Sequence, residues 1–430
     1  MEKPTRLTMD NGMRLIVAED HAVPAAAVAF CMNVGVCDEA PDRRGVAHFM
    51  EHMMFRGSKN VREQDHAQLI ARLGGSSNAF TSPDSTTFFE TVPNDGIEQV
   101  FELEADRFQH LDITAQNTET ERKVILEELS GYENQPTVRA MLMIAEQVMA
   151  EHPYALGPLG RRADLEALAV EDLQQFYGRC YRPDRAVAVV CGDVSTPQVQ
   201  ELAHRTFGSW RPAVAKKEPT NHAPLQPRTG ALSLRLPLEV PLVVQAYRIG
   251  PLRDLDRPAL QMLDALLSSG ASSPMREALV RQRRLCVEAG CSLLTAARGG
   301  LLVLYGVFMP PGRHAQRRAV MNQITQELVE NGPNADQFER HLKRFRMAMA
   351  NDTYSHQARA QGLGHAELFE GGFEHYHHAL EHIAAVTPQR VRDLARSVFA
   401  PENALSLDVT PQHTRWWMWA LGLFLRMRSR

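Results

Sequence analysis

The sequence predicts an α+β protein with two domains of similar size. The chain has 430 residues, strand-like and helix-like patterns alternate in both halves, and prolines interrupt one long polar stretch near the middle. Single cores rarely grow beyond about 300 residues, so a chain of this length suits two domains of about 200. We expect a first domain over residues 1–210, a linker over 211–230, a second domain over 231–411 and a tail over 412–430.

A short segment recurs in the two halves at a constant offset. The spacing of apolar, aromatic and proline residues over 173–186 is repeated over 391–404, which is 218 residues later (391 − 173). Each copy predicts a helix, a proline turn and a strand. The recurrence indicates that the two domains are related.

Individual elements follow from local patterns. Apolar and β-branched runs bounded by turn residues indicate strands, whereas apolar residues spaced three and four apart indicate helices. The expected strands are 7–19 (with a turn at Asn11-Gly12), 25–36, 86–92 and 186–190, and the expected helical or amphipathic segments are 64–73, 94–110, 115–131 and 138–150. Residues 76–85 form a polar stretch before the strand at 86, and the second half is expected to run strand, helix, strand, helix.

Composition narrows the class of protein. The chain is 44% hydrophobic and 23% charged, which is typical of an ordinary globular protein. A net charge of −4 offers no electrostatic attraction for nucleic acid. The N-terminus lacks the apolar core of a secretory signal, and none of the six cysteines forms a CxxC pair, so reduced thiols and a cytoplasmic location are expected.

The C-terminal tail qualifies that location. Residues 416–425 are apolar and rich in tryptophan, and residues 426–430 are mostly basic. Crossing a bilayer takes about 20 apolar residues, so this segment is too short to span one. Three alternatives stay open: peripheral contact with a membrane through residues 416–430, docking on a partner, and docking on the protein's own core.

The motif with the clearest chemistry is His48-x-x-Glu51-His52. At about 100° per residue, these three side chains lie within an arc of roughly 100° on one side of a helix. The opposite side is apolar and suited to burial, with Val46, Phe49, Met50 and Met53. Imidazole and carboxylate groups are zinc ligands, and the order matches the inverted zincin signature. Taken alone, the motif leaves a metal site and an ordinary polar helix face equally open.

A third ligand is expected from residues 115–131. Glu121 and Glu128 are seven residues apart and nearly superimposed on a helical wheel, on its apolar side, whereas Glu127 points away. A carboxylate on an apolar face is costly unless it is paired or bound to a cation. We therefore predict Glu128 as a metal ligand, with Glu121 behind it to orient a histidine. The alternative is an amphipathic helix whose glutamates only reach towards solvent.

Several motifs together resemble the pitrilysin/insulinase family of zinc peptidases. Residues 45–58, followed by Glu128 at 76 positions after His52 (128 − 52), carry the resemblance. It favours the short-chain branch typified by the zinc-bearing beta subunit of mitochondrial processing peptidase and its bacterial relatives. Further matches include Asn11-Gly12, Asp38-Glu39, Asn78-Ala79-x-Thr81, Glu104-Ala105-Asp106-Arg107, His152-Pro153-Tyr154, Tyr181-x-Pro183 and Gly192-Asp193.

The resemblance implies a fold and a site. The fold is two homologous α+β domains, each a mixed, mostly antiparallel sheet packed with helices, forming half of a clamshell. One Zn²⁺ per chain would be held by His48, His52 and Glu128, with Glu51 as general base. The substrate would add as a strand on a sheet edge beside Asn78 and Ala79.

One departure from the family concerns its second half, where an arginine and, seven residues later, a tyrosine grip the substrate. Arg281 matches the arginine, but position 288 is Glu288. A heterodimer with a zinc-less sister chain that brings both residues is therefore attractive, and a self-sufficient homodimer stays open.

The leading hypothesis for the function is a zinc endopeptidase acting on short or unfolded peptides in a dimeric chamber. The alternatives are a non-catalytic scaffold subunit and a subunit dedicated to processing one precursor. A second histidine-rich segment, with His375, His377, His378 and His382, is interpreted as an exposed polar helix face.

Overall fold

A computed structural model describes residues 3–63, 65–149, 152–155, 157–211, 229–250, 256–297 and 299–412. The expected tryptophan-rich tail and nearly all of the expected linker lie outside these residues. The contacts between Cα atoms divide the chain into two units. The first unit comprises Met1–Leu129, Leu156–His222 and Ala348–Ala379, and the second comprises Ser130–Ala155, Ala223–Met347 and Leu380–Arg430. The contiguous domain boundaries expected above stay a prediction.

The first unit is built on a six-stranded sheet in the order β1-β2-β6-β3-β5-β4. Only β2 and β6 pair in parallel, and every other pair in the sheet is antiparallel. The strands are β1 (Thr5–Thr8), β2 (Arg14–Glu19), β3 (Ala25–Met32), β4 (Ser76–Thr81), β5 (Thr86–Pro93) and β6 (Ala186–Gly192). The turn expected at Asn11-Gly12 separates β1 from β2, and Gly12 there has a φ of 89°.

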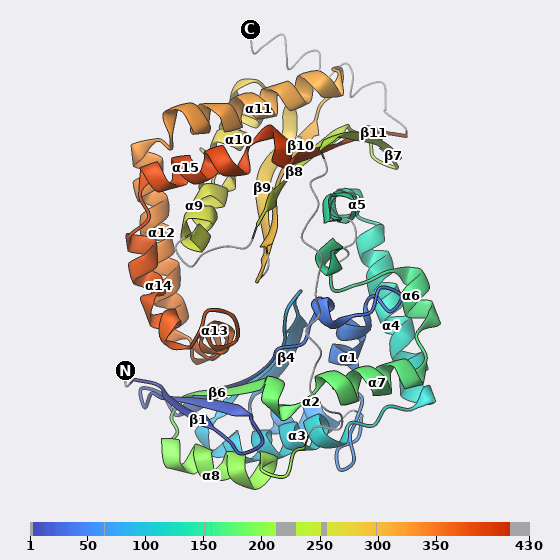
Figure 1. Ribbon diagram of the computed structural model, residues 1–430, viewed down its shortest axis with the longest axis vertical. Helices are drawn as coiled ribbons and strands as arrows, with labels where there is room; N and C mark the ends of the chain where they lie inside the picture. The colour runs from blue at the N-terminus through green and yellow to red at the C-terminus, as the bar shows by residue number, and fades with distance from the viewer. Residues whose placement is uncertain are drawn as a thin grey trace. The chain divides into compact units, whose positions relative to one another are not determined.

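Helices cover both faces of this sheet (Figure 1). The helices of the first unit are α1 (Val46–Met53), α2 (Asp65–Arg72), α3 (Ile97–His110), α4 (Ala115–Glu133, which ends in the second unit), α6 (Arg162–Ala167), α7 (Val170–Cys180), α8 (Thr196–Phe207) and α13 (His356–Phe369). On one face the Phe30 ring lies 5.4 Å from that of Phe108 and 5.3 Å from that of Phe207. On the other face α13 contacts β3 and β6. Because both faces are buried, β3 and β6 are apolar along nearly their whole length.

Residues 348–379 therefore group with the first sheet, although they are distant from it in the sequence. Gly364 on α13 permits the close approach, since a Cβ at that position would lie 2.3 Å from the Cys31 sulfur. Ala360 and Leu363 of the same helix are fully buried against the sheet. Helical periodicity predicts an apolar face of this kind, but it does not identify the surface that the face covers.

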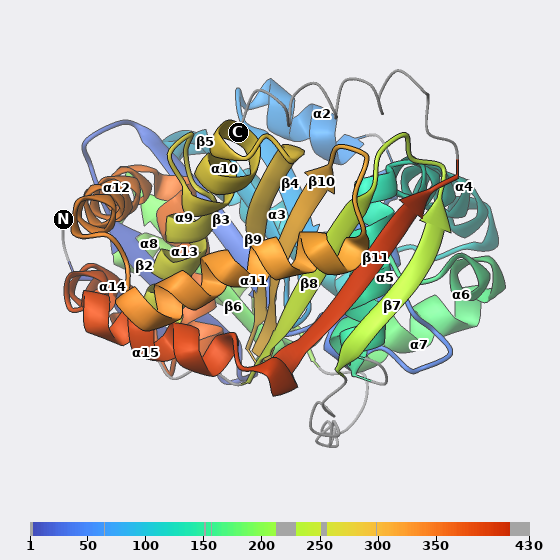
Figure 2. The same ribbon diagram turned by 90° about the horizontal axis from the view of Figure 1, so that it is seen from above.

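The second unit contains a five-stranded sheet in the order β7-β11-β8-β10-β9 (Figure 2). Its strands are β7 (Gly230–Leu236), β8 (Leu242–Ile249), β9 (Cys286–Ala296), β10 (Gly299–Phe308) and β11 (Ala404–Pro411). Its helices are α5 (Pro136–Met149), α9 (Asp256–Ser268), α10 (Pro274–Arg276), α11 (His314–Asn331) and α15 (Pro388–Val398), while α12 (Ala335–Tyr354) and α14 (Glu374–Ala384) cross the division between the units. Only β7 and β11 pair in parallel.

The expected relation between the halves holds at the level of elements. Without β1, the first sheet reads β2-β6-β3-β5-β4, and the second reads β7-β11-β8-β10-β9 with its parallel pair at the same end. Helix α7 occupies 170–180 and α15 occupies 388–398, so the two are 218 residues apart at both ends. The predicted α+β class with two mixed, mostly antiparallel sheets is confirmed.

Two details differ from the expectation. Residues 76–81, expected only as a polar stretch, form the edge strand β4, whose side chains are exposed or half-buried on both faces. An edge strand of this kind lacks the apolar alternation that identifies a strand in a sequence. The second half begins with two strands instead of a strand and a helix. None of the described helices has the length and hydropathy needed to cross a bilayer.

Candidate metal centre

Helix α1 carries the His48-x-x-Glu51-His52 motif, as its spacing predicts. Its apolar side is fully packed, since Phe49, Met50 and Met53 are all 0% exposed. The opposite side presents the motif, and the His48 and His52 ring centroids lie 4.6 Å apart. The amphipathic helix therefore places two imidazoles side by side.

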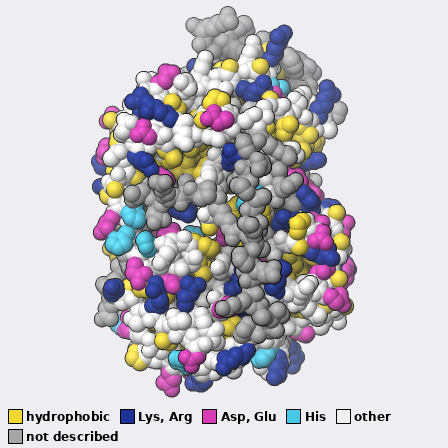
Figure 3. Space-filling model, viewed as in Figure 1, with side chains coloured by type: hydrophobic (Ala, Val, Ile, Leu, Met, Phe, Trp, Pro, Cys, Tyr) yellow, Lys and Arg dark blue, Asp and Glu magenta, His cyan; other side chains and the backbone are white. Residues whose placement is uncertain are grey.

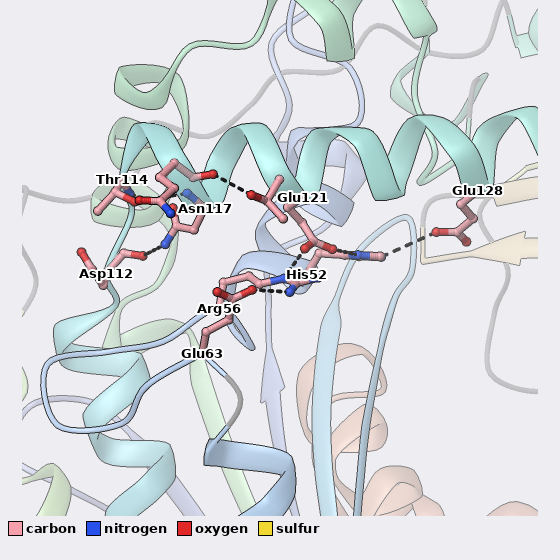
Figure 4. Close-up of polar contacts among 10 residues, drawn as sticks. His52, Arg56, Glu63, Asp112, Thr114, Asn117, Glu121 and Glu128 are labelled. Atoms are coloured by element: carbon pink, nitrogen blue, oxygen red, sulfur yellow. Dashed lines mark hydrogen bonds and ion pairs between the residues drawn. The ribbon is translucent and has the colours of Figure 1, made fainter.

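Helix α4 brings the carboxylate of Glu128 to the two imidazoles. Figure 4 shows Glu128 facing the ring of His52. Glu128 Oε2 lies 3.6 Å from His52 Nε2 and 3.9 Å from His48 Nε2. The three potential ligand atoms all lie within 4.8 Å of one another. These separations are longer than hydrogen bonds, and they leave space between the three atoms.

The donor set and its spacing fit Zn²⁺. Zinc binds imidazole nitrogen and carboxylate oxygen at about 2.0–2.2 Å, so tetrahedral ligand atoms lie roughly 3.4 Å apart. Burial lowers the pKa of His48 to about 4, because it disfavours the imidazolium. The imidazole is thus neutral at ordinary pH, which is the form that binds a metal.

Glu121 lies behind His52, on the side away from Glu128 (Figure 4). Nδ1 of His52 donates a hydrogen bond of 2.6 Å to Glu121 Oε1, and this contact directs Nε2 towards Glu128. The guanidinium of Arg56 pairs with the other oxygen of Glu121. Although burial opposes ionisation, the hydrogen bonds from His52 and Arg56 lower the pKa of Glu121. An ionised carboxylate here favours one tautomer and one orientation of the His52 ring.

The role of Arg56 was not foreseen from the sequence. The inward position predicted for Glu121 implied a cationic partner, because a buried carboxylate needs one. Arg56 lies one helical turn after His52 and also pairs with Glu63 at 2.5 Å, so i,i+4 spacing on the extension of α1 could have identified it.

Glu51 projects from α1 towards the edge strand β4. The hydroxyl of Thr81, the last residue of β4, donates a hydrogen bond of 2.6 Å to Glu51 Oε2. Burial is the main cause that raises the pKa of Glu51 above its usual value. A raised pKa makes the carboxylate a stronger proton acceptor. Thr81 occurs in a motif that carried the family resemblance, but its contact with Glu51 was not foreseen.

Asn78 and Ala79 both lie on β4, which contacts α1. One side of β4 pairs with β5, and no described strand pairs with its other side. Phe80, which lies between Ala79 and Thr81 on the same strand, is 44% exposed. Unpaired backbone groups on an edge strand can accept a further strand.

Arg281 and Glu288 belong to the second unit, so the cluster in the first unit is assembled without them. Arg281 lies in the π-helical segment Glu277–Gln282, is exposed, and pairs with Glu277 at 3.3 Å. Glu288 lies on β9 and accepts a hydrogen bond of 3.0 Å from the hydroxyl of Tyr305 on the neighbouring strand.

A second group of histidine and carboxylates lies in the core of the first unit. The potential ligand atoms of His66, Glu90 and Glu104 lie close enough together to bind one metal ion. However, the guanidinium of Arg107 already contacts Glu104 at 2.7 Å and Glu90 at 3.2 Å. Burial raises the pKa of Glu90 well above its usual value, whereas Glu104 keeps a lowered pKa beside the guanidinium despite its burial. One carboxylate and one guanidinium balance each other, so this cluster needs no metal ion.

The histidine-rich segment lies on α14, where Figure 3 shows a group of histidine side chains at the surface. The ring centroids of His375 and His378 are 6.5 Å apart. In the described part of the chain, this helix contributes to no group of three metal-compatible side chains. His378 is exposed, His375 and His382 are half-buried, and the side chain of His377 lies outside the described part of the structure. The exposed polar face stays a prediction for this segment.

Two family profiles match the chain. The one described as insulinase (peptidase family M16) matches residues 14–160, and the one described as peptidase M16 inactive domain matches residues 167–345. The first match contains all of the clustered side chains, including His48 and Glu128.

Similar proteins carry names of the same kind. An uncharacterized zinc protease of Mycobacterium leprae is 27% identical over 395 residues, which are 91% of this chain and 88% of the relative. The uncharacterized zinc protease YmxG of Bacillus subtilis is 24% identical, covering 94% and 97% of the two chains. A probable mitochondrial-processing peptidase subunit beta of Arabidopsis thaliana is 28% identical over 46% of this chain and 38% of its own length.

Solved structures share the fold. A protease from Helicobacter pylori has a TM-score of 0.89 at 21% identity, with 95% of this chain and 99% of the other covered. A peptidase M16 inactive domain from Pseudomonas fluorescens has a TM-score of 0.83 at 16% identity, with 96% and 99% covered.

Proposed function

Because the chain belongs to the insulinase family of peptidases (family M16), we propose that it is a zinc endopeptidase that hydrolyses short or unfolded peptides. The observation that carries this proposal is the convergence of His48 Nε2, His52 Nε2 and Glu128 Oε2 in the first unit. Two imidazoles and a carboxylate form the ligand set of a catalytic zinc site with an open position.

His48, His52 and Glu128 would hold the ion. Zn²⁺ bound there supplies Lewis acidity, which polarises a carbonyl oxygen and lowers the pKa of a coordinated water towards about 7. Glu51 accepts the proton of the attacking water and delivers it to the leaving amine, for which its raised pKa suits it.

Two contacts keep these groups in place. Thr81 holds one oxygen of Glu51 by a hydrogen bond of 2.6 Å, which orients the other oxygen for proton transfer. Glu121, itself paired with Arg56, fixes the ring of His52. These outer contacts keep the base and the ligand in one arrangement before substrate binds.

The substrate is proposed to bind as an added strand along β4, beside Asn78 and Ala79. Backbone hydrogen bonds of this kind recognise an extended chain more than a particular sequence. Thr81, at the end of the same strand, then links the bound peptide to the base Glu51. Short or unfolded peptides can adopt this conformation, whereas the loops of a folded protein rarely do.

Members of the family act on peptide or protein substrates and often pair with homologous subunits. We propose that this chain is the catalytic member of such a pair, with a zinc-less sister chain that supplies the arginine and tyrosine. Two observations support a partner: Glu288 occupies the tyrosine position and accepts the Tyr305 hydroxyl, and one relative is named as a subunit. The self-sufficient homodimer, in which Arg281 serves alone, is the alternative. Mass spectrometry of the denatured complex purified from its source distinguishes the two pairs, since a heterodimer contains a second polypeptide.

The central test is Glu51→Gln, compared with Glu127→Gln as a control on an exposed carboxylate of α4. Both variants should keep about one zinc per chain, because neither removes a ligand. Glu51→Gln should lose cleavage of oxidised insulin B chain by about 100-fold to 10,000-fold, the usual contribution of a general base. Retained cleavage in Glu51→Gln would reject the mechanism, and absence of stoichiometric zinc in the unaltered protein would favour the scaffold.

A further inference from the structure

The helix that carries the motif lacks a cap of its own. Gly45 is the N-cap residue of α1, has a φ of 95°, and has no side chain with which to accept a hydrogen bond. The first N–H groups of any helix need external acceptors, because they lie ahead of the first intrahelical carbonyls. Something outside α1 must therefore hold its N-terminus.

The two side-chain oxygens of Glu39 accept hydrogen bonds from this N-terminus. Glu39 Oε2 accepts a hydrogen bond of 3.1 Å from the Gly45 N–H, and Oε1 accepts one of 3.0 Å from the Ala47 N–H. The residue is only 6% exposed. A single carboxyl group thus contacts two N–H groups in the first turn of α1, and the second of them belongs to the residue before His48.

Glu39 is itself held by a rigid turn. The carboxylate of the preceding Asp38 accepts a hydrogen bond of 3.1 Å from the Gly35 N–H and pairs with Arg185 at 2.8 Å. Arg179 of α7 donates a hydrogen bond of 2.8 Å to the Asp38 carbonyl. Arg185 immediately precedes β6, so the turn that presents Glu39 is tied to the sheet.

Position matters here because α1 is short. It has eight residues, and the ligand His48 is the third of them. Rotating such a helix by 20° about its axis would move a side-chain nitrogen about 6 Å from that axis by about 2 Å. A zinc site tolerates errors of only about 0.2 Å. Glu128 is positioned by α4, so any shift of α1 alone separates the ligands.

We propose that Glu39 is a positioning residue of the metal centre: it sets the orientation of α1, and hence of His48, Glu51 and His52, relative to Glu128. This inference rests on the proposed function. Glu39 touches neither the metal ligands nor the substrate strand, and it acts through the backbone of α1.

The chain offers a matched control at another helix. Glu19 accepts a hydrogen bond of 2.7 Å from the N–H of Thr196 and another from its hydroxyl, at the first residue of α8. It lies in the same first unit and holds the start of a helix in a comparable way. Helix α8 carries none of the proposed site residues, so Glu19→Gln should report only the loss of a cap.

The test compares Glu39→Gln, Glu39→Ala and Glu19→Gln in the full chain loaded with Co²⁺ in place of Zn²⁺. Glu39→Ala should weaken Co²⁺ binding about 10-fold to 100-fold, the usual effect of removing an outer-shell partner, and should change the visible absorption bands. With zinc, kcat should fall by at least about 10-fold while KM stays within about twofold. Glu39→Gln keeps one acceptor oxygen and should recover part of each effect. Glu19→Gln should leave the Co²⁺ spectrum, the metal affinity and kcat unchanged.

An unaltered Co²⁺ spectrum and affinity in both Glu39 variants would overturn the inference, as would equal changes in Glu19→Gln. Where Glu39→Ala does not fold, Glu39→Gln carries the comparison by itself. The proposed function fails separately, since an unaltered protein that binds no metal, or an active Glu51→Gln variant, refutes it whatever Glu39 does.

Discussion

Apart from β1, the two units share one strand order, and their helices at one equivalent position differ in the side chains they carry. In the first unit α1 follows β3 and contacts β4 and α7. In the second, α9 follows β8 and contacts β9 and α15, which are the counterparts of β4 and α7. Helix α1 presents two histidines and a glutamate on its polar side. Helix α9 lacks such a motif and buries the apolar residues Ala259, Leu260, Met262, Leu263, Ala265, Leu266 and Leu267.

The difference shows that topology does not make the site. The same helix position can serve as packing in one unit and as a proposed metal centre in the other, depending on which side chains occupy it. The centre also needs a second helix, α4, with carboxylates seven residues apart. Substitutions of these side chains can show which of them give the first unit a metal centre that the second unit lacks.

The largest effect is expected from Glu128→Gln. An amide is a much poorer zinc ligand than a carboxylate, so two imidazoles alone should not retain the ion. The variant should lose stoichiometric zinc on dialysis and with it peptide cleavage, as measured by metal analysis and by hydrolysis of oxidised insulin B chain. The neighbouring Glu127→Gln should retain both. Full zinc content in Glu128→Gln would remove this residue from the ligand set.

A smaller effect is expected from Glu121→Gln. Replacing a carboxylate that orders a ligating histidine typically costs about 10-fold to 100-fold in metal affinity. Competition with a chromophoric chelator should show this loss. Because Arg56 pairs with Glu121, Arg56→Gln should also lower the metal affinity. Glu119→Gln, an exposed carboxylate two residues earlier on α4, should leave the affinity unchanged. Equal affinities for all three variants would show that His52 needs no support.

Thr81→Val tests the link between the edge strand and the base. A hydrogen bond to a charged group contributes about 1.5–3 kcal/mol, so kcat should fall by roughly 10-fold to 100-fold while β4 stays intact, because valine suits a strand. Steady-state kinetics provides the measurement. Thr91→Val on β5 is the control, since the buried hydroxyl of Thr91 has no hydrogen-bond partner among the described residues. A kcat equal to that of the control would show that Thr81 is not needed.

The smallest effect is expected from the buried group formed by His66, Glu90, Glu104 and Arg107. The folded-state pKa of Glu90 is raised, mainly by burial, so between its unfolded and folded pKa values the folded protein binds more protons than the unfolded protein. Its contribution to stability is therefore lost as pH rises through that window. Glu90→Gln mimics the protonated form and should gain stability relative to the unaltered protein as pH rises above the usual pKa of a glutamate.

Thermal unfolding midpoints of the two proteins, measured across this range, give the comparison. Glu98→Gln, at an exposed pair with Arg205, should show a constant difference from the unaltered protein. A constant difference for Glu90→Gln as well would mean that Glu90 is ionised in the fold.

Features that depend on neighbours along the chain could be predicted from the amino-acid sequence. The spacing of His48, Glu51 and His52 within one helix, and of Glu121 and Glu128 within another, follows from helical geometry alone. So do the apolar sides of both helices, because each of these signals is local and depends on the number of residues per turn. The repeat at 218 residues comes instead from comparing the two halves of the sequence.

Which segments contact one another became visible in the folded chain alone. The contacts of Glu39 with α1, of Thr81 with Glu51, and of α13 with the first sheet join segments with no periodic relation in the sequence. Such contacts arise when side-chain volumes pack at close to crystal density, which no local pattern records. Helical and strand periodicities specify which face of an element is buried, whereas close packing specifies which surface covers that face.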